Sequence, residues 1–317
     1  MTADERVGYA VAPPGSPIFY EVRRASRASL RGGDAASTIV LCDGIGCDGY
    51  VWKYLRRSLA EDFDQLHWHY PGHGRTPPPR DPSRVTIEDL ADDLAIVLDD
   101  AGIDRAILFG HSMGVQVVLE TFRRHRDRVA ALGLFCGAPG NPLRTFKRTT
   151  VLERLLPGMR AAVGRAPGVA RRLSRMFLPT GLSYAIAAQV EINGRLLDRS
   201  DFMPYLRGLS KVDPTLFLSM LAAAGQHTAT DLLPSVDAPT LIVAGDRDGF
   251  TPPELSHGMA EAIPDAVLIT VEGGSHTAPL ERPHFVDNEV LRFLDNHFGP
   301  LRATRAIEHA VPHNRLP

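Results

Sequence analysis

One stretch, residues 106–122, constrains the fold of this chain most, because an apolar strand turns there at once into a helix. Residues 106–109 form an unbroken apolar run, which predicts a strand buried on both faces, and residues 115–122 have helical length and spacing. Between them lies the pattern Gly110-x-Ser112-x-Gly114. A reversal this tight brings the backbone close to both neighbours, so small residues are needed two positions before and after the apex. The pattern therefore predicts that Ser112 stands at a strained turn, with its hydroxyl exposed beside the N-terminus of a helix.

Ser112 has two interpretations at this stage. A serine that precedes a helix can be a simple N-cap, and the five-residue pattern alone leaves that interpretation open. A buried strand before it and a helix after it favour a nucleophile. A nucleophilic serine also needs an acid and a histidine, which must come from elsewhere in the chain.

Composition limits the class of protein. With 317 residues, of which 44% are hydrophobic and 23% charged, the chain can bury a large core as one α/β domain with an insertion. A formal net charge of -2 provides no general attraction to nucleic acid or membranes. We see no secretory signal and no apolar run long enough to cross a bilayer, so we expect a cytoplasmic protein. Cys42, Cys47 and Cys136 are too few and too odd in number for a disulfide framework, and we interpret them as free thiols.

The order of predicted elements indicates a doubly wound sheet. Two segments, 7–11 and 18–23, flank a Pro-Pro-Gly-Ser turn and predict an edge hairpin. After them strands alternate with helices, which predicts a mostly parallel sheet covered on both sides; the strands are 38–42, 65–70, 106–109, 129–135, 240–244 and 266–271, and the helices 51–59, 86–100, 115–122, 253–262 and 284–298. We divide the chain into a core (1–140 and 232–300), a helical insertion (141–231) with breaks at Pro157, Pro167, Pro179 and Pro204, and a loosely held tail (301–317).

A glycine-rich turn, residues 43–49, is the second functional candidate. Gly44 and Gly46 let the backbone approach a ligand closely and leave the N–H of Ile45 available to an oxyanion. The alternative is an ordinary turn between strand and helix. Asp43 directly precedes this turn, and a carboxylate aimed at the oxyanion would oppose catalysis. We therefore expect Asp43 to turn away and accept hydrogen bonds from loop N–H groups, bracing Gly44 and Ile45.

Three histidines lie close together in sequence, at His67, His69 and His73. A zinc site needs converging ligands and a supporting carboxylate, and nothing nearby supplies a fourth position. We assign no metal site to them and expect no cofactor.

Two later loops complete a possible catalytic set. The strand 240–244 runs into a loop that holds Asp246 and Asp248, and the strand 266–271 runs into a loop that holds His276. Both loops leave from the carboxyl edge of a parallel sheet, which is the edge that carries Ser112. A serine hydroxyl is a weak nucleophile until a histidine takes its proton, and a carboxylate must orient that histidine.

Together these motifs resemble the α/β-hydrolase fold superfamily over about residues 7–300. The resemblance rests on Gly110-His111-Ser112-Met113-Gly114, Pro71-Gly72-His73-Gly74, Asp246-Arg247-Asp248 with Pro252, and Gly274-Ser275-His276. It implies an eight-stranded sheet, a helical lid formed by the insertion, and a triad of Ser112, Asp248 and His276.

The resemblance also implies roles around this triad. Family members usually carry the acid four residues before the loop proline, which selects Asp248 over Asp246. The N–H groups of Ile45 and Met113 would form the oxyanion hole, with Gly44 and His111 supporting them. Many relatives have histidine where this chain has Asp43, so the detail of that loop differs here.

We interpret the chain as a serine hydrolase that cleaves a carboxylic ester through an acyl-enzyme. An acyltransferase, a perhydrolase or a carbon–carbon bond hydrolase would share the triad, whereas a non-catalytic receptor would be expected to have lost one member. Apolar clusters in the insertion either roof an acyl pocket or attach the insertion to the core; they are Leu152, Leu155 and Leu156, then Met176, Phe177 and Leu178, then Leu216, Phe217, Leu218 and Met220.

Between residues 141 and 180 one acid, Glu153, faces many cations. They are Arg144, Lys147, Arg148, Arg154, Arg160, Arg165, Arg171, Arg172 and Arg175. This basic stretch is either a solvated face or a surface for an anionic substrate, an acyl carrier or a lipid surface.

Overall fold

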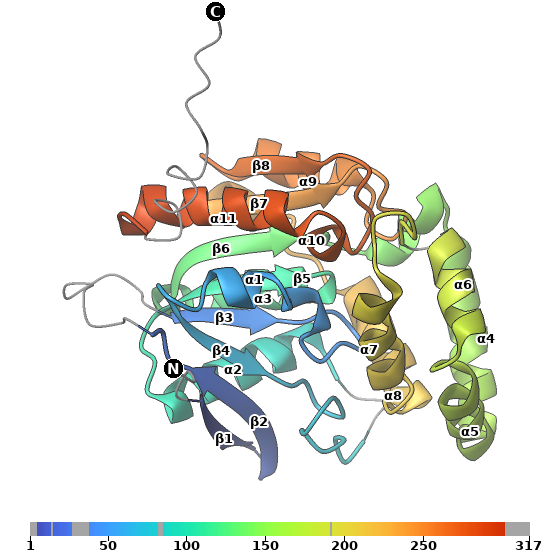
Figure 1. Cartoon of the computed structure of the whole chain (residues 1–317). Coiled ribbons are helices and arrows are strands. Elements are labelled where there is room, and N and C mark those ends of the chain that lie inside the picture. The colour runs from blue at the N-terminus through green and yellow to red at the C-terminus, as the bar shows by residue number, and fades with distance from the viewer. Residues whose placement is uncertain (1–4, 14, 27–37, 82–84, 191, 302–317) are drawn as a thin grey trace, which may run out of the picture.

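The computed structural model describes residues 5–13, 15–26, 38–81, 85–190 and 192–301. Eight strands form one sheet in the order β1-β2-β4-β3-β5-β6-β7-β8 (Figure 1). β1 (Glu5–Ala12) and β2 (Ser16–Arg23) form the antiparallel hairpin predicted at the edge, and β2 pairs antiparallel with β4. All the other neighbours pair in parallel, so the mostly parallel, eight-stranded α/β fold is confirmed.

The central strands are buried along their whole length. They are β3 (Thr38–Cys42), β4 (Asp64–Trp68), β5 (Ala106–His111), β6 (Val129–Phe135) and β7 (Thr240–Gly245), whereas β8 (Val267–Val271) is partly exposed at the far edge. Side chains alternate between the two faces with the period of a strand. In β5, Leu108 joins one core and Phe109 the other.

Helices cover both faces of the sheet. α2 (Ile87–Ala101), α3 (Met113–Arg124) and α9 (Pro253–Ala262) contribute to one core; α1 (Leu55–Ser58), α10 (Ala278–Glu281) and α11 (Pro283–Phe298) contribute to the other. The predicted cap of α2 is present: Thr86 Oγ1 accepts from the N–H of Asp89, whose carboxylate accepts from the N–H of Thr86.

The prediction of one helix over residues 51–59 is wrong. A short 3-10 turn (Tyr50–Trp52) is followed by the single-turn helix α1. Tyr50, Val51 and Trp52 are all buried, and three consecutive buried side chains do not fit on one face of a helix.

Five helices follow one another in residues 141–231, on the right of Figure 1. They are α4 (Val151–Arg165), α5 (Pro167–Phe177), α6 (Gly181–Val190), α7 (Arg199–Leu209) and α8 (Pro214–Gln226). The predicted breaks at Pro157 and Pro204 are wrong, because both prolines lie inside helices. Each is exposed, so water can bond the carbonyl that the missing N–H leaves unpaired. Pro167 does begin a helix, and Pro179 lies between two.

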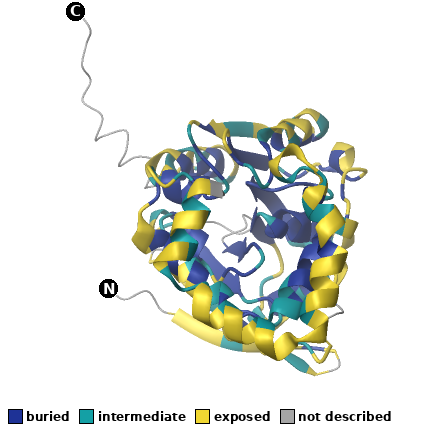
Figure 2. Ribbon diagram, turned by 90° about the vertical axis from the view of Figure 1, so that its right-hand side faces the viewer, coloured by how far each residue is buried: buried dark blue, intermediate teal, exposed yellow. Residues whose placement is uncertain are grey.

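Exposure is concentrated on this insertion. Figure 2, which faces the right-hand side of Figure 1, shows exposed helices around a buried centre. None of the described helices is both long and apolar enough to cross a membrane. The predicted loose tail lies, from residue 302 onward, outside the described residues.

Candidate active site

Ser112 occupies a strained turn between β5 and α3. Its φ of 56° and ψ of −119° lie outside the regions that non-glycine residues normally adopt. A Cβ on Gly110 would lie 2.3 Å from the carbonyl oxygen of Gly114, and one on Gly114 would lie 2.3 Å from that of Cys42. The Ser112 side chain makes no capping hydrogen bond to α3, so the simple N-cap interpretation does not hold.

The structure brings Ser112, His276 and Asp248 into one hydrogen-bonded chain. Ser112 Oγ lies 2.9 Å from His276 Nε2, and His276 Nδ1 lies 2.9 Å from Asp248 Oδ2. The Asp248 side chain is buried, whereas that of His276 is 15% exposed. Asp246, the other candidate acid, is exposed to solvent. A nucleophile, a base and an orienting carboxylate in this order can carry out acyl transfer.

The Asp248 carboxylate is held by its own loop. Oδ1 accepts hydrogen bonds from the N–H groups of Phe250 (2.8 Å) and Thr251 (2.9 Å), and Oδ2 accepts from Thr251 Oγ1 (2.8 Å). Sequence reasoning missed Thr251, although an Asp followed three residues later by Thr is a recurrent turn pattern. These donors fix the carboxylate as an acceptor facing His276.

Two further residues hold the loop that carries His276. His111 Nε2 donates to the carbonyl oxygen of His276 (2.9 Å), which requires the proton on Nε2. Burial, together with the nearby His276, lowers the pKa of His111 to about 4, so this ring is neutral. Glu281 of α10, which the sequence did not indicate, accepts from the N–H of Ser275 (2.6 Å) and from its hydroxyl. His111 therefore contacts the backbone of His276, and its supporting role stays a prediction.

The glycine-rich turn lies directly beside Ser112. A Cβ on Gly44 would lie 3.0 Å from the Cβ of Ser112, which explains the need for glycine. No described residue accepts a hydrogen bond from the backbone N–H of Ile45 or of Met113. Two N–H groups without partners next to a serine hydroxyl are suited to an oxyanion.

His73 connects this turn to the Pro-Gly-His-Gly loop. Its Nε2 accepts from the N–H of Gly46 (3.0 Å), so its proton is on Nδ1, which donates to the carbonyl oxygen of Pro71 (3.0 Å). His73 is buried, and burial lowers its pKa. The neutral ring therefore holds the turn in position. In the sequence His73 was part of the Pro71-Gly72-His73-Gly74 motif, but this supporting role was not predicted for it.

Asp43 differs from the expectation in its partners. Its carboxylate accepts three hydrogen bonds of 2.8 Å, from the N–H of Gly49, Trp52 Nε1 and His67 Nε2. The expected donors were backbone N–H groups of the loop, and of the three observed donors only the N–H of Gly49 is of this kind. Two buried side chains supply the other bonds, because Trp52 and His67 pack under the turn.

Asp43 and His67 form a buried ion pair. Burial is the largest single effect and favours the neutral forms of both, but the charge attraction and the hydrogen bonds together outweigh it, so the pKa of Asp43 is lowered and that of His67 is raised to about 9. The Glu21 carboxylate lies 3.8 Å from His67 Nδ1 and 2.8 Å from Arg56 Nη1, and the interaction with His67 is the main reason why the pKa of Glu21 is lowered to about 2. Alternating charges thus lie beneath the turn.

A cavity of about 250 Å³ opens at Ser112. On the core side it is lined by Ile45, Cys47, Tyr50, Phe250 and His276. On the insertion side it is lined by Ala187, Ile192, Phe202, Tyr205, Leu206, Phe217 and Leu221. Of the apolar clusters singled out in the sequence, only Phe217 lines this cavity; Leu152, Leu156 and Leu218 pack between insertion and core, and Leu155, Met176 and Phe177 are exposed.

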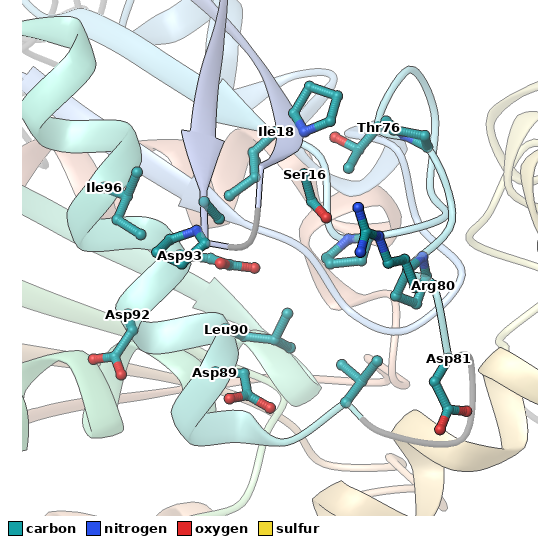
Figure 3. A pocket seen from close by; sticks show the side chains of 17 residues that line it. Ser16, Ile18, Thr76, Arg80, Asp81, Asp89, Leu90, Asp92, Asp93 and Ile96 are labelled. Atoms are coloured by element: carbon teal, nitrogen blue, oxygen red, sulfur yellow. The ribbon is translucent and has the colours of Figure 1, made fainter.

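A larger cavity, about 430 Å³, lies away from these residues, between the β1–β2 hairpin and α2. Figure 3 shows acidic side chains of α2, Asp89 and Asp93 among them, on one side of it and Arg80 on the other. Burial and the neighbouring Asp89 raise the pKa of Asp93 to about 7. No predicted site residue lines this cavity, so its size does not make it the active site.

One set of described side chains has the spacing of a metal site: Glu88, Glu120 and His227. Glu120 Oε2 already accepts from His227 Nε2 and from Arg123 Nε, both at 3.0 Å. A guanidinium therefore already balances the charge of this carboxylate.

Comparison with known proteins identifies the family. A family model described as alpha/beta hydrolase fold matches residues 37–283, which include the Ser112 turn, Asp248 and His276. The chain belongs to the α/β hydrolase fold family.

This α/β hydrolase resembles proteins of several activities. It is 25% identical to a putative carbamate hydrolase RutD of Pseudomonas savastanoi pv. phaseolicola, over 88% of this chain and 99% of that protein. It is 29% identical to polyketide synthase ThaQ of Burkholderia thailandensis, over 90% of this chain but only 13% of that protein. The crystal structure of the enol-lactonase from Burkholderia xenovorans has a TM-score of 0.69 and 25% identity, and the match covers 90% of this chain and 99% of that one.

Proposed function

We propose that this α/β hydrolase cleaves carboxylic esters through an acyl-enzyme on Ser112. The observation that carries the proposal is the chain of two 2.9 Å hydrogen bonds from Ser112 Oγ through His276 to Asp248, at the mouth of an apolar cavity. Membership of a hydrolase family supports it, and so does the enol-lactonase, whose name denotes a cyclic ester.

In this proposal Ser112 Oγ attacks the ester carbonyl carbon while His276 Nε2 takes the hydroxyl proton. The carbonyl oxygen becomes an oxyanion and accepts from the N–H groups of Ile45 and Met113. His276 then gives its proton to the alcohol as the carbon–oxygen bond breaks. Water repeats the sequence: His276 takes a proton from it, its oxygen attacks the acyl carbon, and the acid leaves as Ser112 regains a proton. Asp248 stabilises the charged imidazole throughout.

The cavity favours a small or medium apolar acyl group. Its volume of about 250 Å³ is below the range of roughly 300–1,000 Å³ common for ligand sites, and its lining is mainly aliphatic and aromatic. Since Ala187, Phe202, Tyr205 and Phe217 come from the insertion, we propose that the insertion acts as a lid and sets acyl-chain length. Acyl transfer to an alcohol is the alternative reaction, and product analysis in the presence of added alcohols distinguishes the two.

A fluorophosphonate probe tests the proposal directly. It should label the wild-type chain at Ser112 and leave Ser112→Ala unlabelled, and Ser112→Ala should lose several orders of magnitude in the kcat for short-chain esters. The matched control is Ser200→Ala, since Ser200 is exposed on α7 and does not line the cavity at Ser112, and it should still be labelled. Near-full ester hydrolysis by Ser112→Ala would overturn the mechanism.

A further inference from the structure

Helices α4, α5 and α6 expose a regular set of large apolar side chains to solvent. On α4 these are Val151, Leu155 and Met159, which are 54%, 57% and 41% exposed. Each is four residues from the next, and positions four apart lie on the same face of a helix. The exposed residues therefore form one stripe, while Leu156, on another side of the helix, is buried in a cluster with Leu218 and Leu221 of α8.

α5 repeats the arrangement with Val169, Leu173 and Phe177, which are 60%, 45% and 52% exposed. Their spacing is again four, so they too lie on one face of the helix. On α6, Leu182 and Ile186 are 66% and 56% exposed. These helices occupy one end of the molecule (Figure 1), and the view onto that end shows them largely exposed (Figure 2). Contiguous apolar exposure of this kind marks an interaction surface.

Arginines border the apolar stripes. At about 100° per residue, Arg154 and Arg165 lie beside the stripe of α4, and Arg172 lies beside that of α5. Among the described residues no ion-pair partner exists for Arg154, Arg160, Arg165, Arg172 or Arg175. The apolar and cationic groups are thus both available to a partner.

We propose that the outer face of α4, α5 and α6 binds an anionic lipid surface. Amphipathic helices with large apolar residues on one face and arginines beside them lie in membrane interfaces, where the apolar groups enter the acyl region and the cations meet lipid phosphates. The chain as a whole, with a net charge of -2, has no such attraction, so the interaction is local to this face.

Charge decides between this partner and a second copy of the chain. Residues 141–180 contain nine basic residues and one acid, and pairing two such faces would bring like charges together. A folded protein partner would need a shape complementary to the three separate apolar stripes. A lipid surface needs no such shape.

A lipid-bound face would also give an ester substrate a route to Ser112, and this route rests on the proposed function. α6 exposes Leu182 and Ile186 on one side, and Ala187 on its other side lines the cavity at Ser112. One helix thus separates the lipid-facing surface from the acyl cavity. An amphiphilic ester dissolved in the membrane would have a short path to the nucleophile.

Vesicle binding by the full chain carrying Ser112→Ala tests the docking without any hydrolysis. The partition coefficient of this chain should be much higher on vesicles of phosphatidylcholine mixed with phosphatidylglycerol than on vesicles of phosphatidylcholine alone. Added salt should lower it. Adding Arg154→Gln and Arg172→Gln should lower the partition coefficient roughly fivefold for each arginine.

The apolar part is tested by adding Leu173→Ser and Phe177→Ser, which should lower partitioning by about tenfold or more. Matched controls lie on β1 at the sheet edge: Val7→Ser with Val11→Ser replaces residues that are 51% and 63% exposed and should leave binding unchanged. Thermal unfolding checks that each variant is folded.

Equal binding to neutral and anionic vesicles would overturn the proposal, as would variants that bind like the parent. A dimer in sedimentation that Leu173→Ser and Phe177→Ser dissolve would assign the face to a second copy instead. Vesicle binding is measured on an inactive chain, so it can be interpreted even if the proposed ester hydrolysis is wrong.

Discussion

Two aspartate–histidine pairs of nearly the same geometry lie on either side of the Ser112 turn. His276 Nδ1 lies 2.9 Å from Asp248, and His67 Nε2 lies 2.8 Å from Asp43. They differ in what faces the second ring nitrogen. For His276 it is the hydroxyl of Ser112, whereas for His67 it is a second carboxylate, Glu21, at 3.8 Å.

Burial separates the pairs further. The His67 side chain is 2% exposed and that of His276 is 15% exposed. Burial alone would lower the pKa of His67, but the carboxylates of Asp43 and Glu21 outweigh it and raise this pKa to about 9, so His67 keeps its proton. Facing a hydroxyl at a cavity, His276 can take a proton and return it. The same two residue types therefore make a fixed charge in one place and a proposed general base in the other.

The largest expected effect comes from altering Asp248, the acid that faces His276. Asp248→Asn offers an amide to His276 and favours the wrong tautomer, so kcat should fall by about 10⁴-fold. Asp246→Asn, two residues away and exposed, is the matched control and should change kcat only a few-fold. Steady-state kinetics on a short-chain ester measures both. The reverse ranking would assign the acid to Asp246.

A smaller effect is expected at the buried pair. Asp43→Ala removes the acceptor for Gly49, Trp52 and His67 and should loosen the oxyanion turn, lowering kcat by up to about 100-fold, and lowering it more than KM changes. Asp43→Asn keeps an acceptor and should be milder.

The control for this pair of variants is Asp48→Asn, an exposed acid of the same loop, which should leave kcat nearly unchanged. A clear rise of kcat in Asp43→Asn would contradict the bracing role, because the charge itself would then have opposed the transition state.

The smallest effect should be seen in stability against pH. The pKa of His67 is about 9 in the folded chain and about 6.5 in an unfolded one, so the folded state binds its proton more tightly. The pair's contribution to the free energy of unfolding is therefore full below about pH 6.5 and is lost as the pH rises through about 9. Wild type should lose more thermal stability over this interval than His67→Gln does. Parallel profiles for the two chains would mean that His67 is neutral when folded.

Local sequence was enough to predict the frame of the site. The alternation of apolar runs and amphipathic segments predicted the parallel sheet, and that sheet brings the ends of β5, β7 and β8 to one edge. Gly110 and Gly114 indicated the turn because the backbone contacts that exclude a Cβ follow from the reversal itself. Chain order and the loop proline then selected Asp248 and His276 as the residues to join Ser112, and the structure brings those three side chains together.

Tertiary structure alone decided what supports that frame and what covers it. The bonds from His73 to Gly46, from His67 to Asp43 and from Glu281 to Ser275 join loops whose side chains have no periodic signal, and each depends on how separate elements pack. The cavity lining also depends on packing, because the sequence does not distinguish Phe202 and Tyr205 from other buried helix residues. Hydrophobicity says only that a side chain leaves water. Phe217 lines the cavity, whereas Phe177 is exposed to solvent. The packing of the insertion helices on the core decides this difference.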